Sequence, residues 1–477
     1  MSIAQQDHKP VALHQTHYAR EKCKIGVVHL GYGAFHRAHQ AVYLDDYMEE
    51  TGDLNWGIAA VNLRAEDAIG FGRARQITDG YLVKTIDVDG TDYFRLVRSH
   101  QCFRDWSSEP EDAEQLVASR DVHLISITVT ESGYYMDGEG QLDLADPIIA
   151  SELNGTEHRT VYAYLSRALS RRKEAVNLPI TVLCCDNIRA NGKMLQRNLV
   201  AYLEASQQNA LAQWVKRNVS FPCSMVDRIT PHSTSDLVVE ANNLFGSAAL
   251  EPVHAEAFSQ WVLEEKFAGP APALASAGVE VVPDVHPYEE AKIRILNGGH
   301  TALAYLGALA GYKTFDEAMR DPKLRKHFDA FELEEVLPGL RLELPFDKHE
   351  YLRKVSNRFC NRAIADQLER ICMDGYSKVQ LYLRPTLASC LEQGIEPRHT
   401  FDCIASWFVY ARRAKSGHTH VPYNEPYWDQ LSPLLDEGNE MEFATNAVLW
   451  GELPEAYSGF APALVSAIQE MENSWPV

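Results

Sequence analysis

Short apolar runs alternate with longer amphipathic stretches through about the first 230 residues of the chain. Four of the runs are rich in β-branched residues, which is typical of strands that are buried on both faces of a sheet. They occupy residues 24–30, 56–63, 122–130 and 178–187. The segments between them, such as 36–50 and 160–175, have the spacing of helices. This alternation predicts an α/β fold with a mostly parallel, doubly wound sheet.

The pattern changes after the proline-containing stretch VVPDVHPYEE at residues 281–290. Strand signals nearly vanish beyond it, and apolar repeats with helical spacing take their place. These repeats cover residues 291–312, 363–375, 383–394, 401–414 and 461–473. A chain of 477 residues is also long enough for two cores. We therefore expect an α/β domain over residues 1–285 and a mainly α-helical domain over residues 286–477.

Polar residues with catalytic potential interrupt the first helical repeat, in the sequence YEEAKIRILNGGH. At about 100° per residue, Asn297 lies about 140° around an α-helix from Lys292, and His300 lies about 80° around. Glu289, at about 60°, falls in the same sector. A base, an amide donor and an imidazole grouped in this way can remove a proton from an alcohol and stabilise the oxyanion. The same residues also suit a helix with a solvated Lys and Glu and a buried, hydrogen-bonded His.

The sequence HLGYGAFHRAHQ follows the first predicted strand directly and opens a helix. Gly31 and Gly33 form the GxG of a nucleotide-binding turn, in which one glycine permits the tight turn and the other lets backbone amides approach a pyrophosphate. His36 stands where a third glycine is usual, so the fingerprint is incomplete. Its place between a strand and a helix nevertheless favours a Rossmann-like domain that binds a dinucleotide.

Two acids just beyond the second predicted strand bear on the choice of dinucleotide. Glu66 and Asp67 lie where a carboxylate can bind the adenosine ribose, and their charge would repel the 2′-phosphate of NADP. Arg64 beside them partly offsets this charge, and a solvated helix start is the alternative explanation. The two acids therefore favour NAD.

Other polar residues stand at the ends of apolar segments. Asn187 and Glu131 each end a predicted strand, where ligands of such a sheet bind, although Asn187 also suits a turn. Asp227 is flanked by apolar residues and by Arg228, so a structural ion pair is as good an explanation as a catalytic role. Arg370 and Lys378 can bind the hydroxyls of a ligand or can belong to a solvated helix end.

Composition narrows the function classes. The formal charge of 45 − 66 = −21 disfavours nucleic acid and anionic membranes as partners. The nine cysteines are scattered, without CxxC pairs or zinc-type spacing, which favours reduced thiols, a cytoplasmic location and no metal. No segment has the length and apolar character of a signal peptide or a membrane span.

Six motifs together resemble the polyol-specific long-chain dehydrogenase/reductase family, in the same order from about residue 24 to 410. They are HLGYGAFHRAHQ, SITVTESGYY, CCDNIRANG, FPCSMVDRITP, YEEAKIRILNGGH and NRAIADQLERICMDGYSK. The K-x4-N-x2-H spacing is specific to this family. The resemblance implies a Rossmann-like domain followed by a helical domain and a reaction that needs no metal.

The resemblance also implies residue roles. Lys292 would be the general base, and Asn187 and Asn297 would bracket the reacting oxygen. His300 would position a neighbouring hydroxyl, while Glu131 and Glu289 would carry the proton away from Lys292. The remaining assignments are Asp227, Arg370 and Lys378 in the polyol pocket, Gly31, Gly33, Phe35 and His36 in the phosphate turn, and Glu66 with Asp67 as acids that select NAD.

The activity implied is the NAD-dependent oxidation of a polyol to a ketose and its reverse, with D-mannitol and D-fructose as the leading pair. IADQLERI and VSFPCSMVDRITP are nearer to the mannitol 2-dehydrogenase branch than to fructuronate reductase. The alternatives are another hexitol or pentitol dehydrogenase, or fructuronate reductase, for which Arg294 or Arg384 would have to hold a carboxylate. A catalytically silent NAD-binding protein is the alternative outside this class. The oligomeric state stays open, and a monomer is compatible with the sequence.

Overall fold

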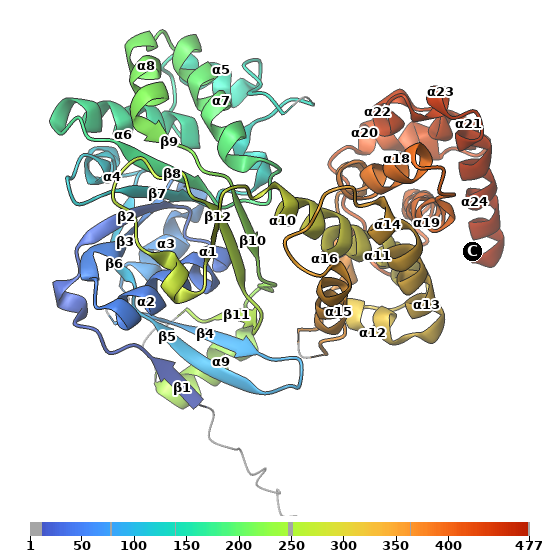
Figure 1. Ribbon diagram of the computed structural model, residues 1–477, viewed down its shortest axis with the longest axis horizontal. Helices are drawn as coiled ribbons and strands as arrows, with labels where there is room; N and C mark the ends of the chain where they lie inside the picture. The colour runs from blue at the N-terminus through green and yellow to red at the C-terminus, as the bar shows by residue number, and fades with distance from the viewer. Residues whose placement is uncertain (1–11, 77–78, 139, 247–250, 363, 476–477) are drawn as a thin grey trace, which may run out of the picture. The chain divides into compact units, whose positions relative to one another are not determined.

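The computed structural model describes residues 12–76, 79–138, 140–246, 251–362 and 364–475. The chain divides into two compact units (Figure 1). Unit 1 comprises Met1–Asp87 and Thr91–His286, and unit 2 comprises Val88–Gly90 and Pro287–Val477. Each unit has hydrophobic clusters of its own.

A six-stranded parallel sheet forms the centre of unit 1. In spatial order its strands are β6 (His100–Asp105), β3 (Gly57–Asn62), β2 (Ile25–Leu30), β7 (Leu124–Ile127), β8 (Ile180–Cys184) and β9 (Val219–Ser220). Numbered along the chain, this order is 3-2-1-4-5-6, the doubly wound arrangement of dinucleotide-binding domains. The predicted α/β class, with a Rossmann-like domain before a mainly helical one, is confirmed.

Both faces of this sheet are covered, as the apolar runs predicted. Val27 belongs to one hydrophobic cluster and its neighbour Val28 to another, because successive side chains of a strand point to opposite faces. One face packs against the helices α4 (Pro110–Val117), α6 (Val161–Ala175), α7 (Asn191–Ala205) and α8 (Asn209–Asn218). The other packs against α2 (Gln40–Thr51) and residues from two smaller sheets.

These two smaller sheets were not predicted. One has the order β1 (Ala12–Gln15), β5 (Asp92–Val97), β4 (Tyr81–Ile86) and β11 (Val253–Glu256). The other has the order β10 (Ser224–Asp227), β12 (Gln260–Glu264) and β13 (Glu280–Val282). Most of these strands carry charged residues, such as the Arg95 of β5, so they lack the continuous apolar run of a central strand.

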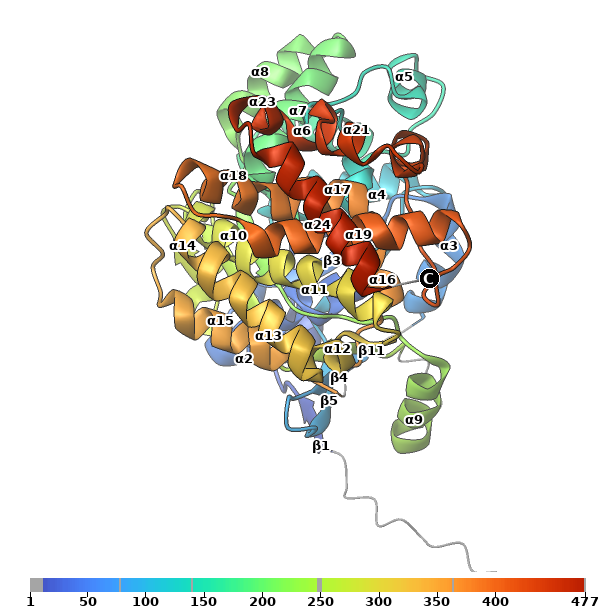
Figure 2. The same cartoon turned by 90° about the vertical axis from the view of Figure 1, so that its right-hand side faces the viewer.

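Unit 2 is built mainly from helices around one hydrophobic cluster. A continuous helical segment begins with α10 (His286–Ala291), passes through the π-helix η6 (Lys292–Asn297) and ends with α11 (Gly298–Leu309). The long helix α19 (Arg398–Lys415) packs against both α11 and α24 (Phe460–Ser474) (Figure 2). The helices α13 (Pro322–Ala330) and α18 (Arg384–Glu392) complete the parts of this unit that bear on the site.

The helix predicted over residues 363–375 is correct for only half of the described residues 364–375. Of the described residues, only α16 (Leu368–Cys372) and the first residue of α17 (Gly375–Lys378) are helical there. Ala365 has a φ of 46°, which a helix does not tolerate, and the strand-like bridge Thr314–Gln367 follows it. Tertiary pairing has therefore overridden the local helical pattern, and residue 363 lies outside the described residues.

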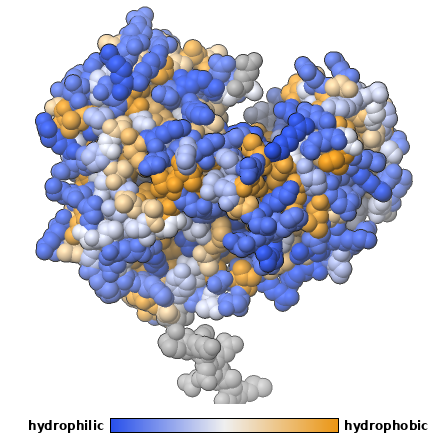
Figure 3. Space-filling model, viewed as in Figure 1, coloured by the Kyte–Doolittle hydropathy of each residue, from blue (hydrophilic) through white to orange (hydrophobic). Residues whose placement is uncertain are grey.

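One face of the molecule is mainly polar. On the face shown in Figure 3, hydrophilic residues predominate and hydrophobic ones form small groups between them. Within the described residues, no helix combines the length and the apolar character that a membrane span requires. All nine cysteines are free thiols, and six of them are buried.

Candidate active site

The glycine turn after β2 lies at the switch point of the large sheet, between β2 and β7. Gly31 has a φ of +94°, and its amide donates to the carbonyl of Val61 at 3.1 Å. A Cβ at this position would lie 3.1 Å from the carbonyl carbon of Thr128 and still closer to its oxygen, so only glycine fits. A Cβ at Gly33 would meet nothing within 4 Å, which leaves its backbone open to a ligand. The turn therefore fits a bound pyrophosphate.

A group of buried histidines supports this turn. His29 stacks on His36 with ring centroids 3.2 Å apart, and His36 Nε2 lies 3.1 Å from His100 Nε2. Burial lowers the pKa of His29 to about 3 and holds the pKa values of His36 and His100 well below their usual range. These rings are therefore neutral at neutral pH. Because His36 is fully buried, its ring supports the phosphate turn by packing, while Phe35 stacks on His39 at 4.9 Å.

Asp186, for which the sequence indicated no role, joins the ends of β7 and β8. Its carboxylate accepts hydrogen bonds from the amides of Val129 and Thr130 at 3.0 and 3.1 Å, and from the Tyr134 hydroxyl at 2.6 Å. Burial raises the pKa of Asp186 to about 6. Asp186 thereby fixes the loop that carries Glu131, next to Thr130 with its unusual φ of 67°. Such backbone strain is typical of functional sites.

Three further predicted residues lie in unit 1. Asn187 is exposed and directly follows Asp186. Glu66 and Asp67 are exposed and lie beyond the end of β3, where Asp67 forms an ion pair with Arg64 at 2.7 Å. Within the described chain, Glu66 forms no such ion pair, so its charge is available to a ligand.

Asp227 is the last residue of β10 and is buried. The guanidinium of its neighbour Arg228 contacts two backbone carbonyls and a hydroxyl. It donates to the carbonyls of Glu256 and Ala38 and to the hydroxyl of Thr85.

In unit 2, the helical segment changes its geometry at Lys292. The residues Lys292–Asn297 form a π-helix, in which hydrogen bonds join residues five apart rather than four. The uniform step of about 100° per residue assumed from the sequence is therefore wrong here. In the wider turn, Asn297 lies closer in direction to Lys292 than an α-helix would place it. Single π-turns of this kind are frequent at functional sites.

The side chains of this segment are mostly withdrawn from solvent. Lys292 is 7% exposed and Glu289 is 6% exposed, so the alternative of a solvated Lys and Glu is wrong. The amide nitrogen Nδ2 of Asn297 is buried and makes no hydrogen bond within the part of the chain that the structure describes. An unsatisfied buried donor costs about 1–3 kcal/mol, so this amide suits a ligand that accepts its hydrogen bond.

His300 lies between two aromatic rings. Its ring packs edge-on against Phe315 at 4.3 Å and stacks on Phe359 at 5.0 Å. Its Nε2 atom is 3.8 Å from the carboxylate of Asp366. Burial lowers the pKa of His300 to about 3, with Arg370 and Lys378 acting in the same direction and Asp366 in the opposite one. The imidazole is therefore neutral and can both donate and accept a hydrogen bond.

Two predicted pocket residues come close to His300. Arg370 forms a two-point ion pair with Asp366 through Nε, at 2.9 Å, and Nη2. Lys378 donates to the carbonyl of Ile371 at 2.8 Å, and burial together with Arg370 lowers its pKa. The structure thus brings His300, Arg370 and Lys378 together around Asp366. No sequence signal marks Asp366, because its position depends on the non-helical stretch that replaces the first part of the predicted helix.

A second residue without a sequence signal lies behind the π-helix. Glu332 is fully buried in a neighbouring π-helix, η7 (Phe331–Val336), and a Cβ on Gly299 would clash with its carboxylate. Neither carboxylate oxygen makes a hydrogen bond within the described chain. Burial raises the pKa of Glu332 well above its usual range, so the group is a neutral acid beside Gly299. A third π-helix, η8 (Val379–Leu383), packs against η6 as well.

Two family models match the chain. The Mannitol dehydrogenase Rossmann domain matches residues 25–276, and the Mannitol dehydrogenase C-terminal domain matches residues 284–471.

Named relatives match nearly the whole chain. A mannitol 2-dehydrogenase of Phaeosphaeria nodorum is 36% identical over 96% of this chain and 81% of its own length. A D-arabinitol 4-dehydrogenase of Ralstonia nicotianae is 36% identical over 90% of this chain and 92% of its own length. A polyol:NADP oxidoreductase of Gluconobacter oxydans is 33% identical over 90% of this chain and 88% of its own length.

Two solved structures have the same fold. The mannitol 2-dehydrogenase of Pseudomonas fluorescens, in a ternary complex with NAD and D-mannitol, superposes with a TM-score of 0.85 at 31% identity and covers 97% of this chain and 94% of its own. A D-sorbitol dehydrogenase in substrate-free form superposes with a TM-score of 0.86 at 30% identity and covers 98% of this chain and 96% of its own.

Proposed function

Because this chain belongs to the mannitol dehydrogenase family and is a polyol dehydrogenase, we propose that it interconverts D-mannitol and D-fructose with NAD as cofactor. One observation supports the chemistry most strongly. Lys292 is buried on a π-helix whose last residue, Asn297, has a buried amide without a hydrogen-bond partner in the described chain. A base and an unused donor on one turn suit an alcohol that loses its proton while its oxygen gains negative charge.

In the proposed reaction, Lys292 Nζ takes the hydroxyl proton of the polyol while the hydrogen on the same carbon leaves as hydride. When bound at the glycine turn, NAD supplies the acceptor for that hydride. The amides of Asn297 and Asn187 donate to the reacting oxygen, and these bonds strengthen as charge develops. Glu289 and Glu131 pass the proton from Lys292 towards solvent.

The neighbours of His300 support an uncharged polyol as substrate. Lys378 and the neutral ring of His300 offer hydrogen bonds to hydroxyls, while Asp366 already balances the charge of Arg370. The arginines considered for a uronate carboxylate are engaged elsewhere. Arg294 donates to Thr386 and Glu290, and Arg384 donates to the carbonyl of Leu449. These contacts favour a polyol over the fructuronate alternative.

For the cofactor, NAD(P) binding follows from the family, and the preference for NAD is part of the proposal. Glu66 supports it, because this exposed acid beyond β3 carries a charge that no ion pair balances within the described chain. A carboxylate at this position binds ribose hydroxyls and repels a 2′-phosphate. Because one relative is named for NADP, the assay must include both cofactors.

An absorbance assay of NADH formation tests the substrate and the cofactor. The panel contains D-mannitol, D-sorbitol and D-arabinitol with NAD and with NADP, and D-fructose and D-fructuronate in the reducing direction. We expect the highest kcat/KM with D-mannitol and NAD. A higher value for another polyol, or for D-fructuronate, would replace D-mannitol and D-fructose as the proposed pair.

A matched pair of lysine variants tests the base. Lys292→Ala is expected to lower kcat by about 10²–10⁴-fold, the usual contribution of a general base, and to leave NADH binding nearly unchanged. Lys354→Ala removes an exposed lysine of the same unit and is expected to leave both values unchanged. Equal losses of binding and turnover in Lys292→Ala would mean that Lys292 has a structural role.

A further inference from the structure

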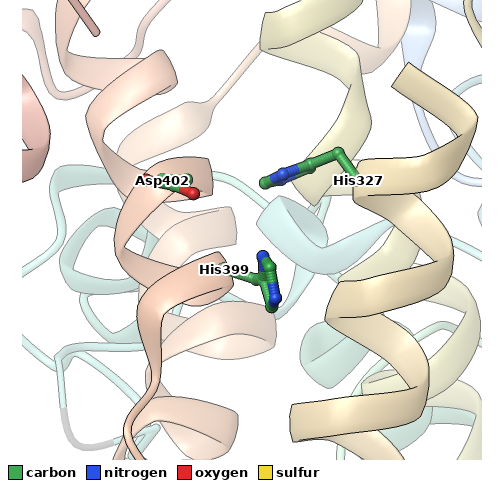
Figure 4. A group of neighbouring side chains, drawn as sticks. All are labelled: His327, His399 and Asp402. Atoms are coloured by element: carbon green, nitrogen blue, oxygen red, sulfur yellow. The ribbon is translucent and has the colours of Figure 1, made fainter. Parts of the chain in front are cut away.

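Three potential metal ligands meet between two helices of unit 2, outside the residues that the proposed reaction uses. His327 extends from α13, and His399 and Asp402 extend from α19 towards it (Figure 4). Each offers one ligand atom, and these atoms all lie within 4.8 Å of one another. His327 is far from the other two in sequence, so no short sequence motif predicts these three ligands together.

The backbone and the neighbouring side chains hold this group in place. His399 and Asp402 are three residues apart in the first turns of α19, so they share one face of the helix. Glu335 fixes the start of α19, because its carboxylate accepts the amides of His399 and Thr400 at 2.6 and 2.8 Å. The ring of His327 packs edge-on against that of His399 at 5.6 Å, and its Nε2 lies 3.3 Å from Cys403 Sγ.

The hydrogen bonding of His399 leaves one nitrogen available. Its Nε2 lies 3.4 Å from a carboxylate oxygen of Glu334. Its Nδ1 is buried and has no hydrogen-bond partner in the described part of the chain. A proton on Nε2 leaves the Nδ1 lone pair free, and a carboxylate behind a histidine is the usual way to orient a metal-binding ring.

We propose that His327, His399 and Asp402 bind one Zn²⁺ ion that joins α13 to α19. Two imidazoles and a carboxylate form a donor set that suits zinc, whereas calcium and magnesium prefer oxygen ligands alone. Water completes the tetrahedron. Zinc bonds of about 2 Å require the ligand atoms to approach to about 3.5 Å, a contraction that side-chain rotation can supply.

The proposed ion has a structural role. Phe328, the residue after His327, packs directly against Gly299, where a Cβ would clash with its ring. The helix α13 therefore supports the segment between Asn297 and His300. An ion that binds the folded unit and not the unfolded chain stabilises that unit by mass action. The ion takes no part in the proposed hydride transfer, so this inference does not depend on the proposed substrate.

Calorimetric titration of the chelator-treated full-length protein with ZnCl₂ tests the site, together with its metal content by mass spectrometry. We expect one site in the wild type and at least a tenfold weaker affinity in His327→Gln and in Asp402→Asn. His349→Gln, which changes an exposed histidine of the same unit, is expected to bind as the wild type does. A melting temperature raised by about 5 °C at a hundredfold excess of Zn²⁺ over Kd is expected only where the site is intact.

Circular dichroism identifies any variant that fails to fold, in which case the other variant decides. Unchanged affinity in either folded site variant, or no binding to the wild type, would overturn the proposal. Loss of zinc binding in Lys292→Ala would also overturn it, because the ion would then belong to the catalytic segment. At temperatures below its melting temperature, His327→Gln is expected to oxidise the polyol at a rate within about twofold of the wild-type rate.

Discussion

The two glycines of the nucleotide turn are expected to respond to alanine in opposite ways. At Gly31, alanine meets two penalties. The φ of +94° costs a residue with a side chain about 1–2 kcal/mol, and the clash with the Thr128 carbonyl adds about 1–3 kcal/mol, since it involves two backbones at the centre of the sheet. The free energy of unfolding should therefore fall by roughly 2–5 kcal/mol.

At Gly33, the same change should leave the fold almost untouched. This residue caps α1 (Ala34–Ala38) with a φ of −80°, which alanine adopts without strain, and a Cβ meets nothing within 4 Å. Loss of a glycine cap costs at most about 1 kcal/mol. If the pyrophosphate approaches this backbone closely, however, the added methyl group should raise the Kd for NADH at least about tenfold, or about 1.4 kcal/mol.

Thermal unfolding and NADH fluorescence titration separate the two effects. Gly31→Ala should lower the melting temperature by roughly 5–15 °C, whereas Gly33→Ala should lower it by only a few degrees and mainly weaken NADH binding. Gly70→Ala, at a half-buried position of α3 (Ala68–Ala74), serves as the control, since a Cβ there would meet only the tip of the Arg73 side chain at 4.0 Å. Wild-type stability in Gly31→Ala, or wild-type affinity in Gly33→Ala, would refute the reasoning for that glycine.

Three further predictions concern single side chains. Asn297→Ala should lower kcat by about 10²–10³-fold, as loss of an oxyanion donor does, without loss of thermal stability, because it removes an unsatisfied buried group; steady-state kinetics with D-mannitol and a melting curve check both. Burial lowers the pKa of His29 to about 3, so unfolding takes up a proton at any pH between that value and about 6.5. The difference in free energy of unfolding between the wild type and His29→Asn should therefore be largest above about pH 6.5. It should shift against the wild type by up to about 1.4 kcal/mol per pH unit as the pH falls from there towards 3. A difference in urea unfolding that does not change with pH would contradict this. Burial raises the pKa of Glu332 well above its usual range, so the native acid stays protonated while the unfolded carboxyl ionises. Glu332→Gln should therefore leave the free energy of unfolding almost unchanged near pH 4 and raise it towards neutral pH, by up to about 1.4 kcal/mol for each pH unit above about 4.3. Urea unfolding across this pH range checks it, and a loss of stability at pH 7 would instead indicate an ionised, paired carboxylate.

Four of the six strands of the central sheet, β2, β3, β7 and β8, could be predicted from the sequence because they obey one local rule, whereas the edge strands β6 and β9 were not predicted. Val27 and Val28 face opposite clusters, so both must be apolar, and the run is visible without knowledge of the fold. The strands of the smaller sheets have no such signature, because residues such as Arg95 point to polar partners, here Asp45 and Asp46. Their pairing is decided by tertiary contacts.

The candidate site shows the same division. Lys292, Asn297 and His300 could be selected from the sequence because polar groups with these chemistries stand out in an apolar helix. The π-turn that carries the first two could not, because nothing in KIRILN distinguishes five-residue from four-residue hydrogen bonding. Asp366 could not be selected from the sequence either. It lies 3.8 Å from His300 only because the backbone of Ala365 departs from helical φ values.

The three π-turns of unit 2 have a consequence for protein engineering. Each turn amounts to an ordinary helix into which one extra amino acid has been inserted, and the turn at Lys292 packs against the other two. Copying K-x4-N-x2-H onto a regular helical scaffold would therefore point the amine and the carboxamide in divergent directions. A designer would have to transplant the insertion and its two packing neighbours along with the three functional groups.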